Sequence, residues 1–457
     1  MVATAAGSSP FAAAPPHHAG EAVPQGANDA VWHGLIWAFR RIIGVYFREI
    51  EVAGNIPSSD VGGRVFVANH TNGIVDPILI LTTAPPRIAP VAKSTLWKTP
   101  GLRWLLDQAG AVPITRRRDD PTKAQGANES VFDKIAAAIS AKKNILIFPE
   151  GTSHNEPKLI EVKSGAARMI ARAKEQGARG LTFQSVALEF DERDTFRSRC
   201  LLVYGPVRDV DEMGLEGDEL VAAITERLRD DLSELLVEGA TWPERVLIAR
   251  VAEMLVNDLG DKSLERWNSI GRQVEAARKA LGDADEATVK EVSDVVTRYY
   301  ERLLEEGLAD EQLATGAVPG KTNTVADAAL LFSLPLAALG AVLYAPPWHL
   351  TRILANKVAK EQDELSTYKL GVGLLAYPAW AAALTAAGFM LTPPPISLGI
   401  GAAVVASPFA ALAWHDAAPK LRRAVRFASR KDRLEELRAL RAEALGRVEA
   451  VRVKLGL

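Results

Sequence analysis

The chain has 457 residues, of which 48% are hydrophobic, and its 54 basic and 56 acidic side chains leave a net charge of −2. This length allows a sizeable core and more than one structural unit, and the balanced charge does not indicate a nucleic-acid partner, which usually shows as a basic excess. The single cysteine, Cys200, excludes a disulfide framework and a zinc site built on paired cysteines. No HExxH motif occurs, so the sequence predicts no metal site.

Residues 1–28 are rich in Ala, Pro and Gly. They lack the basic start and continuous apolar segment of a secretory signal, so we expect a disordered leader. Residues 31–50 follow with apolar side chains along a predicted helix and a basic pair, Arg40 and Arg41. This helix is interpreted either as an interfacial helix at a membrane or as an ordinary packed helix.

Short β-rich runs alternate with helix-length segments up to about residue 210. The predicted strands are "RVFVAN", "RIAPVAK", "NILIFPE", "TFQSVALEF" and "CLLVYGPV". Strands separated by helices predict an α/β fold, with a sheet flanked by helices and at least some parallel pairing. Residues 211–324 are charged and helix-forming, and we expect an α-helical extension there.

Two uncharged stretches follow, at residues 328–348 and 370–414. The second is about twice the roughly 20 residues that cross a bilayer, and "TPPP" at Thr392–Pro395 divides it, so we predict a helical membrane hairpin. The first contains Pro335, and it is expected to span, to dip into the membrane or to lie at its interface. The alternative for the whole region is the Ala-rich helical core of a soluble protein.

Basic residues flank the predicted hairpin on both sides. They favour cytoplasmic flanks with the "TPPP" tip on the other side of the membrane. If residues 328–348 do not span, the catalytic domain before them lies on the cytoplasmic face too. The basic tail at residues 419–457 is expected to attract anionic lipid head groups. Its three-four spaced apolar seam, which includes Leu434, Leu437 and Ala444, favours packing within the chain over a coiled coil.

The first chemical motif is "VFVANHTNGIVDP", where an apolar strand stops at Asn69-His70 and Asp76 follows. An imidazole titrates near physiological pH, and a carboxylate on its far nitrogen fixes the tautomer, so such a pair can take a proton from an alcohol. The alternative for His70 is a hydrogen-bonded structural histidine at a strand end.

Two further segments favour an anion site. In "ILIFPEGTSHNEPKL", Gly151 allows close approach of a ligand to the main chain, and Thr152 and Ser153 offer hydroxyls and amides to a phosphate. In "GAVPITRRRDD", a strand ends at Arg116, whose planar guanidinium suits a bidentate phosphate contact. A plain turn and an exposed basic loop are the alternatives.

The blocks "NHTNGIVDP", "GAVPITR", "FPEGTS" and "VALEF" resemble, in order and spacing, the four motifs of the glycerolipid acyltransferases. "VAKSTLW", "FRSRCLLVYGP" and "VAKEQDELSTYKL" are similar to the branch that acylates glycerol-3-phosphate and dihydroxyacetone phosphate and has a C-terminal membrane hairpin. One departure is the spacing, since five residues instead of four separate His70 from Asp76. The implied divisions are a leader (1–28), an acyltransferase domain (29–210), a helical extension (211–324), membrane helices (325–418) and a basic amphipathic tail (419–457).

The resemblance makes His70 the general base and Asp76 the residue that orients it. It places the glycerol phosphate acceptor on Arg116 and on the turn formed by Glu150, Gly151, Thr152 and Ser153, with Asn69, Lys93 and Lys163 as further substrate-binding candidates. The acyl thioester donor, acyl-CoA or acyl carrier protein, is a co-substrate, and no bound cofactor or nucleic acid is implied. The alternatives are an acyltransferase for lysophosphatidate or another lysophospholipid, and an inactive membrane adaptor that binds lipid phosphates.

Overall fold

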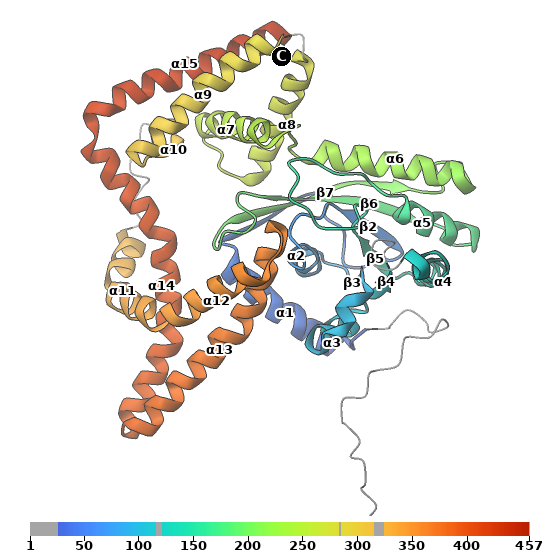
Figure 1. Cartoon of the computed structure of the whole chain (residues 1–457), viewed down its shortest axis with the longest axis horizontal. Helices are drawn as coiled ribbons and strands as arrows, with labels where there is room; N and C mark the ends of the chain where they lie inside the picture. Colours follow the sequence, from blue (N-terminus) through green and yellow to red (C-terminus); the bar gives the residue numbers. More distant parts are fainter. Residues whose placement is uncertain (1–25, 116–120, 283–284, 315–323, 457) are drawn as a thin grey trace, which may run out of the picture.

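The computed structural model describes residues 26–115, 121–282, 285–314 and 324–456. A sheet with helices on both faces forms the centre of the protein, and a group of helices lies beside one edge of the sheet (Figure 1). Two long helices project from the rest of the protein as a hairpin. The α/β fold predicted from the alternating pattern is therefore confirmed.

The described residues form one seven-stranded sheet in the order β1-β7-β6-β2-β5-β3-β4. The strands are β1 (Glu49–Gly54), β2 (Arg64–Ala68), β3 (Ile88–Lys93), β4 (Val112–Ile114), β5 (Asn144–Ile147), β6 (Thr182–Phe190) and β7 (Arg199–Asp209). Every pair is parallel except β6 with β7. The carboxyl ends of β2, β3, β4 and β5 consequently meet at one edge of the sheet, which is where ligands bind in sheets of this kind.

Side chains that alternate along the strands build a core on each face of the sheet, because successive residues of a strand point to opposite faces. The helices around the sheet are α1 (Asp29–Tyr46), α2 (Val75–Thr83), the 3-10 helix η1 (Ser94–Lys98), α3 (Pro100–Ala109), α4 (Pro121–Ser140), α5 (Gly165–Glu175) and α6 (Gly217–Leu235). Val65 and Val67 of β2 pack on one face with α4, α5 and α6, while Phe66 and Ala68 pack on the other with α1 and α2.

Two boundaries differ from the sequence-based expectation. The helix predicted over residues 31–50 ends at Tyr46, and its last residues belong to β1, which pairs in parallel with β7. Helix α6 lies in the segment assigned to the extension, yet its Leu220, Ile224 and Leu228 pack into the core of the sheet. Charge patterning along an amphipathic helix does not reveal which neighbour covers its apolar face.

The extension contains α7 (Trp242–Leu259), α8 (Leu264–Leu281), α9 (Glu286–Glu306) and α10 (Asp310–Ala314), and the C-terminal helix α15 (Lys431–Leu455) lies along α9 (Figure 1). Leu434, Leu437 and Ala444 are buried in a cluster with Val296 and Tyr299. The apolar seam of the tail therefore packs within the chain, as its spacing predicted.

The uncharged region forms α11 (Thr324–Leu343), α12 (Ala345–Val358), the 3-10 helix η3 (Gln362–Glu364), α13 (Leu365–Leu391) and α14 (Pro394–Ser429). Among the described residues, two helical stretches are long and apolar enough to cross a membrane, Gln362–Leu391 and Pro394–Ser429. The segments Ala328–Leu343 and Ala345–Val358 are long and apolar enough to cross a membrane only when they are taken together as one span, which is bent by 48°.

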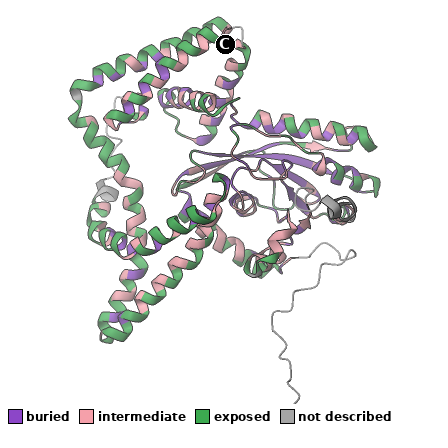
Figure 2. Ribbon diagram, in the orientation of Figure 1, coloured by how far each residue is buried: buried purple, intermediate pink, exposed green. Residues whose placement is uncertain are grey.

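The hairpin of α13 and α14 turns at the predicted "TPPP" segment and leaves its apolar surface uncovered (Figure 2). Leu375 is 74% exposed and Met390 is 84% exposed. An apolar surface of this length suits a bilayer, because a soluble protein would have to bury it.

Candidate active site

The loop between β2 and α2 brings His70 and Asp76 together. Asp76 lies in the first turn of α2 and is fully buried. Its Oδ2 accepts hydrogen bonds from the backbone amides of Thr71 (2.8 Å) and Asn72 (2.7 Å), and it lies 3.0 Å from Nδ1 of His70. A carboxylate that accepts hydrogen bonds from two amides can accept a third from Nδ1–H but has no proton to donate, so His70 is held with the proton on Nδ1 and with Nε2 as a hydrogen-bond acceptor.

The His70 ring is held from its other side by the β5 turn. Phe148 stacks on the imidazole with 4.1 Å between ring centroids. No residue in the described ranges forms a hydrogen bond with Nε2 of His70. The basic nitrogen is therefore fixed in direction and available to a substrate hydroxyl.

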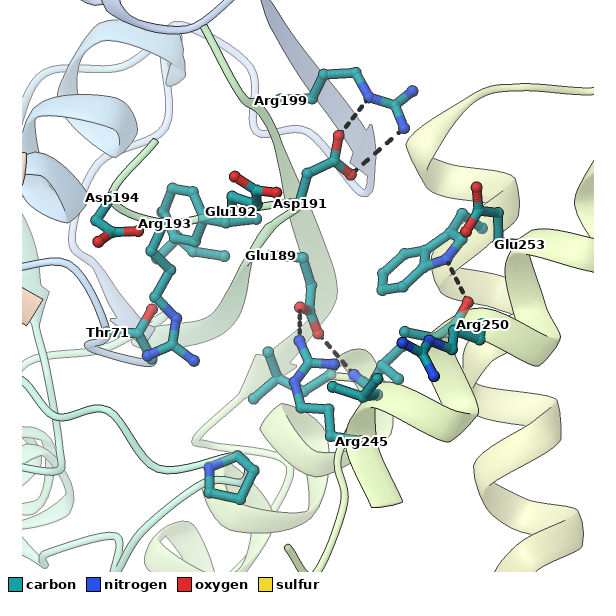
Figure 3. Close-up of a pocket in the computed structure, with 18 of the residues that line it drawn as sticks. Thr71, Glu189, Asp191, Glu192, Arg193, Asp194, Arg199, Arg245, Arg250 and Glu253 are labelled. Carbon is teal, nitrogen blue, oxygen red and sulfur yellow. Dashed lines mark hydrogen bonds and ion pairs between the residues drawn. The ribbon is translucent and has the colours of Figure 1, made fainter. Parts of the chain in front are cut away.

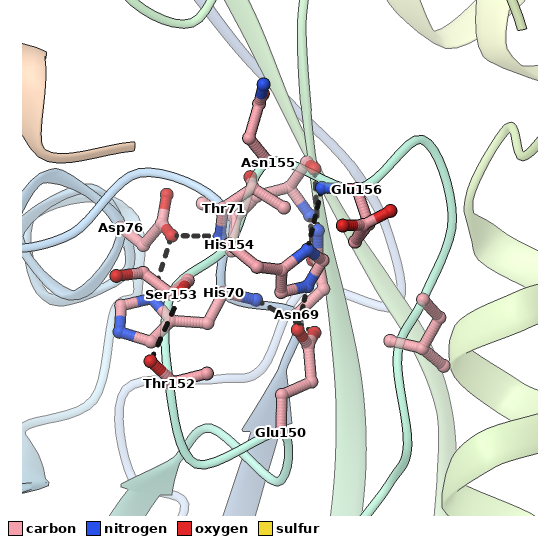
Figure 4. Close-up of polar contacts among 12 residues, drawn as sticks. Asn69, His70, Thr71, Asp76, Glu150, Thr152, Ser153, His154, Asn155 and Glu156 are labelled. Atoms are coloured by element: carbon pink, nitrogen blue, oxygen red, sulfur yellow. Dashed lines mark hydrogen bonds and ion pairs between the residues drawn. The ribbon is translucent and has the colours of Figure 1, made fainter. Parts of the chain in front are cut away.

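Glu150 supports the main chain of His70 from below (Figure 4). Its side chain is fully buried, and Oε1 accepts the backbone amide of His70 at 3.0 Å. Its second oxygen contacts Nε2 of His154, whose Nδ1 accepts the amide of Glu156 at 3.1 Å, so that Nε2 bears the proton that faces Glu150. Both carboxylate oxygens of Glu150 are therefore engaged within the protein, where they support the His70 loop.

The rest of the turn has the geometry of an anion site. Gly151 has a φ of +73°, which only glycine adopts readily, and a Cβ there would lie 2.9 Å from Nζ of Lys163. Nζ of Lys163 donates to the carbonyl of Glu150 at 2.7 Å. Figure 4 shows Thr152 and Ser153 beside the His70 ring. Within the described part of the chain, the backbone amides of these two residues donate to no acceptor.

The remaining candidates from the sequence have different positions. Both ends of the Asn69 amide bond the main chain of Leu188 on β6, with Nδ2 to O at 3.1 Å and N to Oδ1 at 2.8 Å. Asn69 thus ties the end of β2 to β6. Lys93 is the last residue of β3, at the same sheet edge as His70. Arg116 lies outside the described residues.

Comparison with known proteins identifies the domain. Residues 49–189, which include the His70 loop and the Glu150 turn, match the Acyltransferase family model. The chain therefore contains a domain similar to the acyltransferases, in keeping with its resemblance to the glycerolipid acyltransferases. It is 25% identical over 276 residues to the "Glycerol-3-phosphate O-acyltransferase 2" of Saccharomyces cerevisiae, covering 55% of this chain and 37% of that protein.

A second relative is the "Lyso-ornithine lipid O-acyltransferase" of Pseudomonas aeruginosa, 28% identical over 154 residues, which cover 34% of this chain and 52% of the relative. The chain thus matches about half or less of the length of either relative. Among solved structures, the 1-acyl-sn-glycerophosphate acyltransferase of Thermotoga maritima is 19% identical, with a TM-score of 0.32 over 44% of this chain and 77% of the other.

Sequence reasoning missed two residues at this candidate site, His154 and Arg193. Arg193, in the loop between β6 and β7, donates to the carbonyl of His154 (3.3 Å) and to Oδ1 of Asn155 (3.1 Å) and lies over the ring of Trp242. Burial is the main cause that lowers the pKa of Arg193, and the nearby Glu189 and Asp76 carboxylates oppose it. In the sequence, His154 was indicated only by its position four residues after Glu150. Nothing in "DERDTFRSRC" distinguishes Arg193 from its neighbours.

A cavity of about 1180 Å³ lies between this sheet edge and helices α7 and α8 (Figure 3). Thr71, Glu150, His154 and Arg193 are among its lining residues, but His70 is not. The cavity therefore reaches the candidate site on the side of the Glu150 turn.

Proposed function

We propose that the protein is a membrane-bound O-acyltransferase that moves a fatty acyl group from an acyl thioester to glycerol-3-phosphate or dihydroxyacetone phosphate. The observation that supports this most is the orientation of His70. Its ring is fixed by a buried carboxylate and a stacked phenylalanine, and a protein that only bound lipid phosphates would not need a histidine held with a free basic nitrogen.

The proposed reaction is a direct transfer. Nε2 of His70 removes the proton of the acceptor hydroxyl as its oxygen attacks the thioester carbonyl, and Asp76 stabilises the imidazolium that forms. The new C–O bond is made and the C–S bond breaks, after which the imidazolium returns the proton to the departing thiolate. Cys200 is 1% exposed in the sheet core, so it is not placed to form an acyl-enzyme.

The phosphate of the acceptor is assigned to the turn at Gly151, Thr152 and Ser153, with Lys163, Lys93 and Arg116 as cationic partners. Free backbone amides beside a glycine of positive φ favour an anion, and their position next to His70 would put the phosphate one short carbon chain away from the reacting hydroxyl. The donor is acyl-CoA or acyl carrier protein, and it acts as a co-substrate.

The catalytic domain is proposed to lie at the cytoplasmic face of the membrane. Arg197, in the loop between β6 and β7, pairs with Asp416 on α14 (Nε to Oδ1, 3.0 Å), so the domain sits at the end of the hairpin that has the basic flanks. Basic flanks favour the cytoplasmic side. The lipid product then enters the bilayer directly, since each buried CH₂ favours the membrane by about 0.8 kcal/mol.

The acceptor is tested with the purified full-length protein in detergent micelles. Acyl-CoA and acyl carrier protein donors are each offered with glycerol-3-phosphate, dihydroxyacetone phosphate and lysophosphatidate. We expect the highest kcat/KM with one of the first two acceptors. A preference for lysophosphatidate or another lysophospholipid would move the protein to the second acylation step, and an absence of transfer to all acceptors would favour the inactive adaptor.

A further inference from the structure

The first turn of the hairpin helix α13 contacts the loop that holds His70 and Asp76. Oγ1 of Thr367 accepts a hydrogen bond from the backbone amide of Ile74 at 3.0 Å. The adjoining Gly73 has a φ of +45°, and a Cβ at that position would lie only 2.5 Å from the same oxygen. The loop and the helix therefore fit together only because residue 73 has no side chain.

A second contact joins the same two segments through one carbonyl group. The backbone oxygen of Arg193 accepts from Nδ2 of Asn72 (3.0 Å), which belongs to the catalytic loop, and from Oγ of Ser366 (2.8 Å), which belongs to α13. Ser366 is fully buried and also accepts from the hydroxyl of Tyr46 at 3.0 Å. The Ser366 side of the contact is thus shielded from water.

Simple anchoring of the hairpin does not require these bonds. The hairpin is already attached to the domain by the pair between Arg197 and Asp416, by Lys369 on the carbonyl of Asp194, and by Gln362 on Asn155 (2.8 Å). None of these three touches the loop from His70 to Asp76. The bond from Thr367 instead ends on the loop's own main chain, two residues before Asp76.

The length of the loop explains why it needs this support. Five residues separate His70 from Asp76, and the N-cap residue of α2, Ile74, makes no side-chain capping bond. In the described structure, the acceptor for the Ile74 amide is Thr367 and not a group of the loop. An unsatisfied buried amide would cost free energy, and the loop would move to satisfy it elsewhere.

We propose that Thr367 is a positioning residue of the active site, so that the first turn of the membrane hairpin sets the geometry of the His70–Asp76 pair. This inference rests on the acyltransferase function proposed above. It gives the segment "EQDELSTYKL" a role in turnover in addition to any role in membrane attachment. It also predicts that the hairpin matters for acyl transfer even when both substrates are water-soluble.

The test compares three variants of the full-length protein in detergent micelles, with a short-chain acyl-CoA and glycerol-3-phosphate. Thr367→Val keeps the shape but removes the acceptor, and Thr367→Ser keeps the acceptor. The matched control is Thr385→Val in the same helix, where the hydroxyl bonds only the carbonyl of Ala381 (2.8 Å). We expect Thr367→Val to lower kcat about 10-fold with little change in KM, because small misplacement of a catalytic group lowers turnover and not binding.

Thr367→Ser should recover most of the lost kcat, and Thr385→Val should match the wild type. Equal kcat values for Thr367→Val and Thr385→Val would overturn the proposal, as would a Thr367→Ser protein as impaired as Thr367→Val. If Thr367→Val does not fold, Ser366→Ala removes the neighbouring contact and is subject to the same comparison.

Hydrogen–deuterium exchange supplies a readout that does not depend on activity. Peptides that contain Ile74 should exchange faster in Thr367→Val than in Thr385→Val, and unchanged exchange would contradict the contact itself. A wild-type protein that transfers no acyl group would refute the proposed function, while the exchange experiment would still decide whether Thr367 holds the loop.

Discussion

Replacing Asp76 by Asn removes one charge from the centre of the proposed site and keeps the shape of the side chain. Oδ2 of Asp76 contacts three donors, the amides of Thr71 and Asn72 and Nδ1 of His70, and the residue is fully buried. Water therefore cannot reach these three donors to compensate for the lost charge. A hydrogen bond to a charged group is stronger than a neutral one by about 1 kcal/mol, so three weakened contacts amount to about 3 kcal/mol.

The two amide contacts are the same before and during proton transfer, so their weakening lowers the stability of the protein. The contact with His70 changes the barrier, because the ring becomes positively charged as it takes the proton, and Asp76→Asn should lower kcat roughly 100-fold. The assay measures kcat and KM for purified Asp76→Asn, with Asp60→Asn as the control at an exposed loop position. A kcat within about three-fold of the wild type, in a variant that is folded at the assay temperature, would refute the role of the carboxylate.

Three further predictions concern other parts of the chain. Arg441→Met should lower the free energy of unfolding by roughly 3 kcal/mol, because Arg441 binds the buried Asp310 (Nε to Oδ1, 2.7 Å). Thermal or denaturant titrations measure this loss, and an unchanged unfolding transition would contradict the role of the ion pair. Cys200 is buried, which raises the pKa of its thiol, so N-ethylmaleimide should leave acyl transfer unchanged, and inactivation with label on Cys200 would contradict direct transfer. Alkaline carbonate should not release the full-length protein from membranes, since α13 and α14 expose long apolar surfaces, and its release would mean that these helices do not insert.

The sequence predicted the elements whose pattern is local. Apolar runs such as "RVFVA" gave the strands that bear the site, and the uncharged stretch with its "TPPP" break gave the hairpin, because burial and bilayer length are read directly from composition. The seam of the tail was also predictable, since three-four spacing marks a packed helix face.

Contacts between distant segments were not predictable. The partners of Glu150 are the His70 amide and His154, and these contacts depend on how β2 and β5 pair. Thr367 lies 293 positions from Ile74, and no local pattern indicates that bond. Strand β1 was hidden for the same reason, because its stability comes from pairing with β7 and its own sequence, "EIEVAG", has weak strand character.

The central claim is that His70 is the general base of an acyl transfer. The most direct test measures the initial rate of transfer from acyl-CoA to glycerol-3-phosphate by purified full-length wild type and His70→Ala under identical conditions, with folding verified by melting temperature. The account predicts measurable transfer by the wild type and a loss of 100- to 10,000-fold, on the order of that expected for a general base, in the variant. A folded His70→Ala protein that retained activity within a few-fold of the wild type would contradict it.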